Sequence, residues 1–338
     1  MVQKIVLALS WFFMALLLAW FVGYLVIGDR WRYFGLVNLL AVYLFLPLPF
    51  LLLSAVIMKR TSLWVGFTLG LVAFIFLWGF QFNPFRLPVF RKVISEPALS
   101  VMTYNVLAWH DYTGPIIQTI LHEKPDVLFI QELNNNLART LQNELIDEYP
   151  YQILQPADNP TGIGVISRLP INETGVVMPG GWIGGPQVLS LDWQEMQITI
   201  VNIHMTSTTG INSRAHIERT FDQREDQARM LVEFARGRGP IIVAGDANSA
   251  PQNDSYRILA SELEDAWRKA GFGLGHTFPG STIPGSDRPR MGNWYVPAWL
   301  TRIDYIFHSD HFETVEARTA LIDGVSDHRG VLAVLMVR

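Results

Sequence analysis

The feature that most constrains this chain is a set of three long apolar stretches near its N-terminus, none of which contains a charged side chain. They run from Ile5 to Ile27, from Phe34 to Met58 and from Leu63 to Phe80. A helix needs about 20 residues to cross the hydrocarbon layer of a bilayer. The pattern therefore predicts a three-span transmembrane anchor over residues 1–82 and a linker over residues 83–97. The alternative is a cleaved signal peptide followed by buried helices, but the first stretch is too long for a signal sequence.

The number of spans and their direction are less constrained. Pro47 and Pro49 would kink the second stretch or break it into a re-entrant pair. With three spans, the N-terminus and the part after residue 97 lie on opposite sides of the membrane. One side then carries Lys4, Lys59 and Arg60, and the other carries Arg30, Arg32, Arg86, Arg91 and Lys92. The positive-inside rule gives the second side a slight preference for the cytoplasm.

The part of the chain after residue 96 is acidic. It holds 18 of the 26 basic residues and 28 of the 30 acidic residues, a formal charge of −10. General binding of nucleic acid by a basic surface is therefore less favoured, whereas clustered carboxylates suit a divalent cation. The chain contains no cysteine, which excludes disulfides, thiolate zinc sites and cysteine nucleophiles.

From residue 98 onward, short runs of β-forming residues alternate with helical segments. The predicted strands are Ala98–Asn105, Val127–Gln131, Gly164–Ser167, Val188–Asp192, Ile198–His204, Ile241–Gly245, Ile303–His308 and Val331–Val337. The predicted helices are Pro115–Glu123, Asn136–Asp147 and Glu218–Arg236. Without a strict strand–helix alternation, this order predicts an α/β (α+β) domain over residues 98–338, with two packed mixed sheets flanked by helices.

Polar residues stand where several of these strands end. They are Asn105, Glu132, His204, Asp246, Asn248, Asp304, Asp327 and His328. Taken alone, each has an ordinary structural interpretation, because carboxylates cap helices, asparagines form turns and buried histidines are often hydrogen-bonded core residues. Taken together, side chains at strand ends can converge on one edge of a sheet and form an active site.

Five short segments carry a resemblance to a known family. They are Thr103-Tyr-Asn105, Gln131-Glu132, Gly245-Asp-Ala-Asn248, Arg302-Ile-Asp-Tyr305 and Ser326-Asp-His328, with Gly162–Pro170 between the second and third. In this order, over residues 99–338, the chain resembles the endonuclease/exonuclease/phosphatase superfamily. The resemblance implies a DNase I-like four-layer sandwich and divalent-metal-dependent hydrolysis of phosphoesters.

The resemblance also implies roles for the residues at the strand ends. Asn105 and Glu132 would bind Mg²⁺ or Mn²⁺, with Asp327 as an additional candidate ligand, and oxygen ligands of this kind suit these ions. His328 would activate the attacking water or contact the phosphate, and Asp304 would orient it.

Three further residues complete the implied set. Asp246 and Asn248 would place the nucleophile and the scissile phosphate. His204 would hydrogen-bond the phosphoryl oxygens or protonate the leaving group. The assignment of acid and base between the two histidines stays open.

Several features favour a lipid substrate. The segment Asn105-Val-Leu-Ala-Trp109 departs from the pattern of nuclease members of the superfamily, and the loops 180–185 and 291–299 carry Trp182, Trp294, Tyr295 and Trp299. Such aromatic side chains suit the headgroup region, although they can also pack on the domain's own core.

The whole chain is similar to bacterial membrane proteins of the vancomycin- and teicoplanin-resistance group. This similarity implies an integral protein of the bacterial plasma membrane with an extracytoplasmic domain that acts on envelope lipid phosphates, pyrophosphates or phosphodiesters. Membrane lipids are then the expected partners, and no protein partner is evident. A membrane-tethered nuclease and a non-catalytic binding protein are the alternatives.

Overall fold

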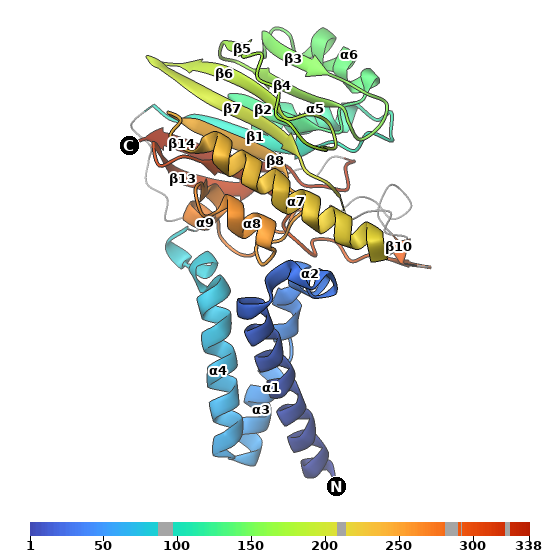
Figure 1. The fold of residues 1–338 in the computed structure, drawn as a ribbon, viewed down its shortest axis with the longest axis vertical. Coiled ribbons are helices and arrows are strands. Elements are labelled where there is room, and N and C mark those ends of the chain that lie inside the picture. Colours follow the sequence, from blue (N-terminus) through green and yellow to red (C-terminus); the bar gives the residue numbers. More distant parts are fainter. Residues whose placement is uncertain (87–96, 208–213, 281–289, 292, 322–324) are drawn as a thin grey trace.

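The computed structural model describes residues 1–86, 97–207, 214–280, 290, 291, 293–321 and 325–338. The C-terminal part forms a sandwich of two six-stranded sheets with helices on both outer faces, and the N-terminal helices form a bundle that extends away from it (Figure 1). The predicted fold class and four-layer arrangement are therefore confirmed.

The first sheet has the strand order β13-β14-β1-β2-β4-β3. Its strands are β1 (Leu99–Asn105), β2 (Val127–Gln131), β3 (Tyr151–Gln155), β4 (Ile163–Ser167), β13 (Phe312–Thr319) and β14 (Val331–Val337). β1 and β2 are parallel, and the other neighbours are antiparallel. The two parallel strands at the centre therefore end at the same edge of the sheet.

The second sheet has the order β5-β6-β7-β8-β12-β9. Its strands are β5 (Ile171–Glu173), β6 (Gln187–Trp193), β7 (Met196–His204), β8 (Ile241–Asp246), β9 (Glu264–Asp265) and β12 (Asp304–His308). β7 and β8 are its parallel pair. The short strands β10 (Arg290–Met291) and β11 (Trp294–Tyr295) form a separate two-stranded sheet.

Three apolar layers hold the sandwich together. Phe129, Ile200 and Ile306 are among the side chains buried between the sheets, where α9 (Ala266–Ala270) also packs. The outer face of the first sheet packs with α5 (Gly114–Glu123) and α6 (Asn135–Glu144), and that of the second with α7 (Arg214–Ala235) and α8 (Asp254–Leu259). Strands covered on both faces read as continuous apolar runs, which explains why the central strands were predictable.

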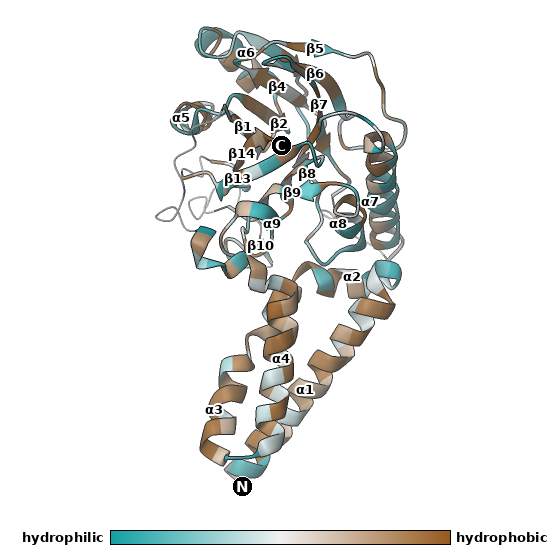
Figure 2. Ribbon diagram, turned by 90° about the vertical axis from the view of Figure 1, so that its left-hand side faces the viewer, coloured by the Kyte–Doolittle hydropathy of each residue, from teal (hydrophilic) through white to brown (hydrophobic). Residues whose placement is uncertain are grey.

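The N-terminal bundle consists of long apolar helices joined by short turns. Its elements are α1 (Val2–Val26), η1 (Gly28–Arg30), α2 (Arg32–Leu39), η2 (Ala41–Phe45), α3 (Leu48–Met58), α4 (Thr61–Trp78), η3 (Gly79–Phe82) and η4 (Pro84–Arg86). Three segments are long and apolar enough to span a membrane, namely Gln3–Val26, Ala41–Met58 and Thr61–Arg86. The N-terminus lies at the end of the bundle far from the sandwich, and the exposed helix faces are apolar (Figure 2).

The second apolar stretch is interrupted where Pro47 and Pro49 were expected to kink or break it, but its candidate span begins later than predicted. It is not one helix from Phe34 to Met58, because α2 and η2 occupy its first part and the candidate span begins only at Ala41. The helical break precedes Pro47, whose missing N–H weakens helix continuity. Gly35 and Asn38 of α2 are buried, and α2 runs beneath α7 rather than away from the sandwich (Figure 1). Residues 87–96 of the predicted linker lie outside the described residues.

The elements missed in the sandwich are short or half-exposed. β3 and β13 were not predicted, and β13 carries Glu313, Glu316 and Arg318 within an edge strand. The predicted helix Asn136–Asp147 ends earlier, at Glu144. An edge strand needs only one buried face, so its sequence shows a weaker apolar run.

We expect Gly245→Ala to destabilise the sandwich, because a Cβ at this position would overlap the backbone oxygen of Ile203 on β7 and the residue has a φ of 151°. The loss should be about 1–3 kcal/mol of unfolding free energy or more, measured as a lower midpoint of thermal unfolding by circular dichroism. Gly239→Ala is the matched control, since nothing lies near its Cβ position. Equal midpoints for the two variants would contradict this account.

Candidate active site

The central strands of both sheets end at one edge of the sandwich, and four of the predicted residues stand there. Asn105 ends β1 and Glu132 directly follows β2, while His204 ends β7 and Asp246 ends β8. The register pairs Asn105 with Gln131 and His204 with Asp246. Because both pairs of strands are parallel, their carboxyl ends meet.

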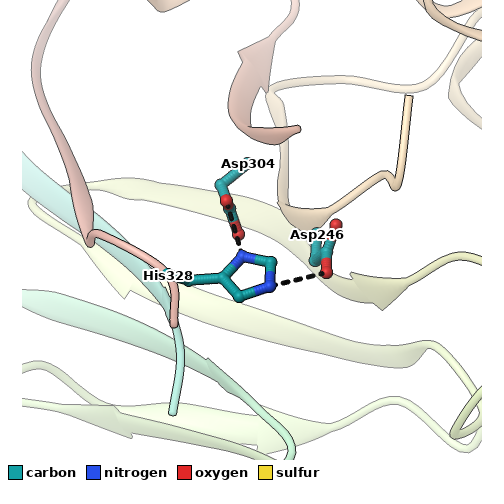
Figure 3. Close-up of side chains that lie close together, drawn as sticks. All are labelled: Asp246, Asp304 and His328. Carbon is teal, nitrogen blue, oxygen red and sulfur yellow. Dashed lines mark hydrogen bonds and ion pairs between the residues drawn. The ribbon is translucent and has the colours of Figure 1, made fainter. Parts of the chain in front are cut away.

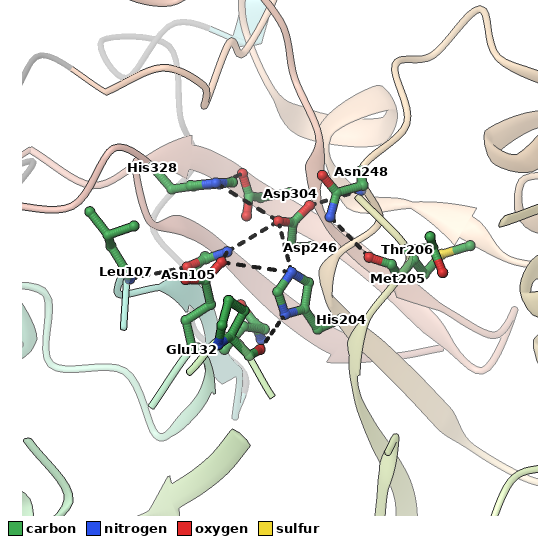
Figure 4. Close-up of polar contacts among 12 residues, drawn as sticks. Asn105, Leu107, Glu132, His204, Met205, Thr206, Asp246, Asn248, Asp304 and His328 are labelled. Atoms are coloured by element: carbon green, nitrogen blue, oxygen red, sulfur yellow. Dashed lines mark hydrogen bonds and ion pairs between the residues drawn. The ribbon is translucent and has the colours of Figure 1, made fainter. Parts of the chain in front are cut away.

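Three of the other predicted residues reach the same edge from the starts of antiparallel strands, and the fourth follows β8. Asp304 opens β12 and pairs with Asp246 in the register. Asp327 and His328 lie just before β14, and Asn248 follows β8. The structure thus brings all eight predicted site residues to one edge; Figure 4 labels all of them but Asp327, whose Oδ1 lies 3.9 Å from Nε2 of His328.

Hydrogen bonds donated by the side chain of Asn105 link the two sheets at this edge. Nδ2 of Asn105 donates to Oε1 of Glu132 at 3.2 Å and to Oδ2 of Asp246 at 3.1 Å. Backbone N–H groups of Leu107 and Ala108 donate to Asn105 and Glu132, respectively. Glu132 has a φ of 58°, a left-handed conformation that costs about 1–3 kcal/mol and tends to occur at functional sites.

His328 is held between two aspartates (Figure 3). Its Nδ1 donates to Oδ2 of Asp304 at 2.9 Å, and its Nε2 lies 3.8 Å from Oδ2 of Asp246. The ring of Phe278 packs beside it at 4.9 Å between centroids. The hydroxyl of Ser326 accepts the backbone N–H of His328 and donates to the carbonyl of Asn105, which fixes this segment to the end of β1.

His204 presents one ring nitrogen to the site. Its Nδ1 lies 3.2 Å from the carbonyl oxygen of Pro160, to which it donates. Its Nε2 lies 3.6 Å from Oδ2 of Asp246 and 3.9 Å from Oε1 of Glu132. The hydrogen bond to Pro160 therefore leaves Nε2 of His204 directed at two carboxylates.

Comparison with known proteins agrees with this geometry. The model of the Endonuclease/Exonuclease/phosphatase family matches residues 102–328. The chain belongs to this family.

Two curated relatives match the family region. An inositol phosphosphingolipids phospholipase C of Saccharomyces cerevisiae is 26% identical over 215 residues, which cover 56% of this chain and 45% of the relative. A putative neutral sphingomyelinase of Caenorhabditis elegans is 25% identical over 171 residues, which cover 45% of this chain and 39% of the relative. The chain thus spans less than half the length of these relatives.

Solved structures share the fold. D. rerio TDP2, in complex with a single-strand DNA product, superposes with a TM-score of 0.55 at 16% identity, covering 72% of this chain and all of the other. A family member from Beutenbergia cavernae superposes with a TM-score of 0.52 at 22% identity and covers 72% of each chain. These likenesses establish the four-layer sandwich.

Buried carboxylates determine the pKa values of the groups at this edge. Burial, together with the charge of Asp304, raises the pKa of Asp246 to about 6. Burial also raises the pKa of Asp327 to about 6, and the charge of Glu132 adds to this effect. Burial lowers the pKa of His328, but the charges of Asp304 and Asp246 outweigh burial and hold this pKa well above its usual range.

This donor set fits a divalent cation. Among the described residues, Oδ1 of Asp304 and Oδ1 of Asp327 are buried and have no hydrogen-bond partner. Ligand atoms of Asp246, Asp304 and His328 also lie within 4.8 Å of one another. Because Nδ1 of His328 is already bonded to Asp304, we regard these three as an orienting cluster and the oxygens of Asn105, Glu132 and Asp327 as the better match to a hard cation.

Two residues that shape the site were missed by sequence reasoning. Asn202 on β7 donates to the carbonyls of Ile130 and Gly164 and accepts from Gln131, so it ties the second sheet to the first. An asparagine inside the apolar run before His204 was the available signal. Arg224 of α7 is buried and donates to the carbonyl of Asn248, and nothing distinguished it from the many other charged residues of that helix.

We expect Asp304→Asn to lower the pKa of His328, because the charge of Asp304 raises it in the native protein. Nuclear magnetic resonance titration of the imidazole in protein dialysed against EDTA measures this change. Since folding raises this pKa, the stabilisation from His328 is complete below its unfolded pKa and is lost as the pH rises through its folded pKa. Asp304→Asn should shift that loss to lower pH.

Asp310→Asn is the control, since the Asp310 side chain is exposed and pairs with His311 away from the site. An unchanged titration of His328 in Asp304→Asn would contradict the assigned cause.

Proposed function

We propose that this protein is a membrane-anchored, divalent-metal-dependent hydrolase that cleaves phosphodiester bonds of lipids. The observation that carries the proposal is the convergence of Asn105 and Glu132 with the Asp304–His328–Asp246 cluster at one edge of the sandwich. This edge combines hard oxygen donors with an oriented imidazole and buried carboxylates, groups that suit metal-assisted hydrolysis of a phosphoester.

Glu132 and Asn105 would hold Mg²⁺ or Mn²⁺, with Asp327 as the additional candidate ligand. When bound, such an ion polarises a phosphoryl oxygen and neutralises developing charge. Ala108 donates to Glu132 and Leu107 donates to Asn105, and these backbone contacts keep both side chains at the edge. The chain's part in metal binding is thus to present oxygens that are already oriented.

The two histidines have different surroundings, which favour different roles. His328 is flanked by Asp304 and Asp246, whose charges raise its pKa and so favour the protonated ring. A protonated ring suits contact with phosphoryl oxygens better than removal of a proton from water. Asp246, with a pKa near 6, and Asn248 would then position the attacking water, and His204 faces the same space through Nε2.

Lipid substrates are favoured by the bundle and by the relatives. Three helices apolar enough to cross a membrane would keep the site close to lipid. The two curated relatives are named for hydrolysis of phosphosphingolipids and sphingomyelin, which favours phosphodiesters over the pyrophosphates that are the alternative lipid class. Trp294 of β11 is 81% exposed and Trp299 is 45% exposed, whereas Trp182 packs against the second sheet's outer core, so Trp294 offers the most exposed surface to lipid.

The alternative functions have weaker support. The shared fold of TDP2 does not choose a substrate, and the acidic charge of residues 97–338 disfavours a tethered nuclease. A non-catalytic binding protein would not need the complete set of eight site residues. We therefore keep the tethered nuclease and the binding protein only as results that the activity assay can distinguish.

We expect the purified protein with Mg²⁺ to hydrolyse sphingomyelin or an inositol phosphosphingolipid in vesicles. EDTA, Glu132→Gln and His328→Ala should each reduce the rate at least about 10²-fold, because a metal ligand or a group contacting the phosphate is lost. Release of the phosphorylated headgroup measures the rate. Circular dichroism establishes that the variants remain folded.

His122→Ala is the matched control, since His122 lies on the outer helix α5 with a half-exposed side chain. Near-normal turnover in Glu132→Gln or His328→Ala would refute the site assignment. Single-stranded DNA, double-stranded DNA and an isoprenoid pyrophosphate complete the substrate panel, and cleavage of nucleic acid alone would refute the lipid assignment.

We also propose that the catalytic domain faces the extracytoplasmic side of the membrane. Because the chain contains no cysteine, a maleimide labels this protein only at a cysteine that is introduced. Glu313→Cys on the exposed edge strand β13 should react with a membrane-impermeant maleimide in intact cells, whereas Lys59→Cys at the α3–α4 turn should react only after lysis. The reverse pattern would place the domain in the cytoplasm.

A further inference from the structure

We propose that Asp29, in the turn between α1 and α2 of the N-terminal bundle, is a positioning residue that holds the site loop. The site loop is residues 247–253, which connect Asp246 at the end of β8 to α8. The effect on turnover rests on the proposed function, whereas the effect on the loop does not.

Asp29 is fully buried between the bundle and the sandwich, and donors from both parts satisfy its carboxylate. Nδ2 of Asn253 donates to Oδ1 at 3.2 Å and to Oδ2 at 3.1 Å, and the backbone N–H of Asp254 donates to Oδ2 at 2.7 Å. From the bundle itself, Nδ2 of Asn38 donates to Oδ1 at 2.9 Å. In return, the backbone N–H of Asp29 donates to the carboxylate of Asp254 at 2.7 Å.

The bundle backbone is shaped for this contact. Gly28 has a φ of 59°, and a Cβ there would overlap the carboxylate of Asp254. A Cβ at Gly35 would press against the ring of Phe221 on α7, and the carbonyl of Gly35 accepts a third hydrogen bond from Nδ2 of Asn253, at 3.0 Å. Close approach of the Asp254 and Phe221 side chains to the backbone at these glycines gives a specific fit rather than a loose apolar contact.

Asn253 carries the constraint into the site loop. Its Oδ1 accepts the backbone N–H of Ala250 at 2.9 Å, so one side chain is bonded both to Asp29 and to the middle of the loop. At the other end of the loop, the backbone N–H of Asn248 donates to Oδ1 of Asp246 at 2.8 Å, and buried Arg224 donates to the carbonyl of Asn248. The charges of Asp29 and Asp246 both act favourably on the Arg224 guanidinium.

A second contact of the same bundle segment leads to the other catalytic aspartate. The hydroxyl of Thr301 donates to the carbonyl of Leu39 at 3.3 Å, and the carbonyl of Thr301 accepts the backbone N–H of Thr277 at 2.9 Å. The hydroxyl of Thr277 accepts the backbone N–H of Asp304 at 3.3 Å, and Asp304 holds His328. The bundle therefore supports the backbone at both Asp246 and Asp304.

The chemistry of the contact makes Asp29 sensitive to a single change. A buried carboxylate without a hydrogen-bonded cation is tolerated only because donors satisfy its oxygens. All four hydrogen bonds to the Asp29 carboxylate come from N–H groups. An asparagine has the same shape but only one acceptor oxygen, so its amide nitrogen would face at least one of these donors.

The test uses the full chain in lipid nanodiscs and compares Asp29→Asn with the wild type by hydrogen–deuterium exchange. We expect exchange of peptides covering residues 247–254 to become about 10-fold faster or more, while peptides of β1 and β2 stay unchanged. Asn253→Ala should reproduce the effect from the sandwich side. Asp222→Asn is the matched control, because Asp222 pairs with Arg32 at the rim of the same contact and its side chain is 59% exposed.

Turnover is measured with bis(p-nitrophenyl) phosphate, a soluble diester that does not require access to lipid. Asp29→Asn should reduce kcat about 10- to 100-fold with a smaller change in KM, and Asp222→Asn should match the wild type. Unchanged exchange of residues 247–254 in Asp29→Asn, or faster exchange with an unchanged kcat, would overturn the positioning role. Wild-type protein that cleaves no phosphoester would instead refute the proposed function, and exchange alone would then decide the role of Asp29 in holding the loop.

Discussion

The hydrogen bond from Asn105 to Asp246 is the interaction on which the site depends, because it joins the ends of the two sheets. Its donor ends β1 of the first sheet and its acceptor ends β8 of the second. Neither sheet alone contains a complete set of site residues, since Glu132 belongs to one and His204 to the other. The apolar layer between the sheets sets their separation, and this polar contact aligns their edges. Packing of the core and chemistry of the site are therefore parts of one structure.

The same edge concentrates negative charge, and this explains several otherwise costly features. Asp246, Asp304 and Asp327 are buried or nearly so, and two of them have an oxygen without a hydrogen-bond partner among the described residues. Buried carboxylates are costly unless they are paired, hydrogen-bonded or bound to a metal. His328 offsets part of the charge and a divalent cation would offset more. The left-handed backbone of Glu132 is a further cost that a purely structural residue at this position would not need.

Much of the sandwich could be predicted because its central strands are covered on both faces and appear as apolar runs. The site could be predicted for a related reason, since polar residues such as Asn105 and Asp246 interrupt the chain where those runs end. Arg224 was missed because its contact with the distant carbonyl of Asn248 leaves no local pattern, whereas Asn202 was marked only by its position inside an apolar run. The break at Pro47 was anticipated, but the separate helix α2 was not, because its place is set by packing against α7, which no local pattern records.

The sequence predicted the bundle only as a membrane anchor, because its hydropathy gives no sign of a further role. Its turn, however, contributes a buried carboxylate that bonds with Asn253 across more than two hundred residues of sequence. A tether that only kept the domain near lipid could end in a flexible linker, because a high local concentration needs no fixed orientation. A docked turn has a different consequence. It fixes the direction in which the site edge of the sandwich faces relative to the helices, and the backbone at Asp246 and Asp304 then depends on the helices being in place.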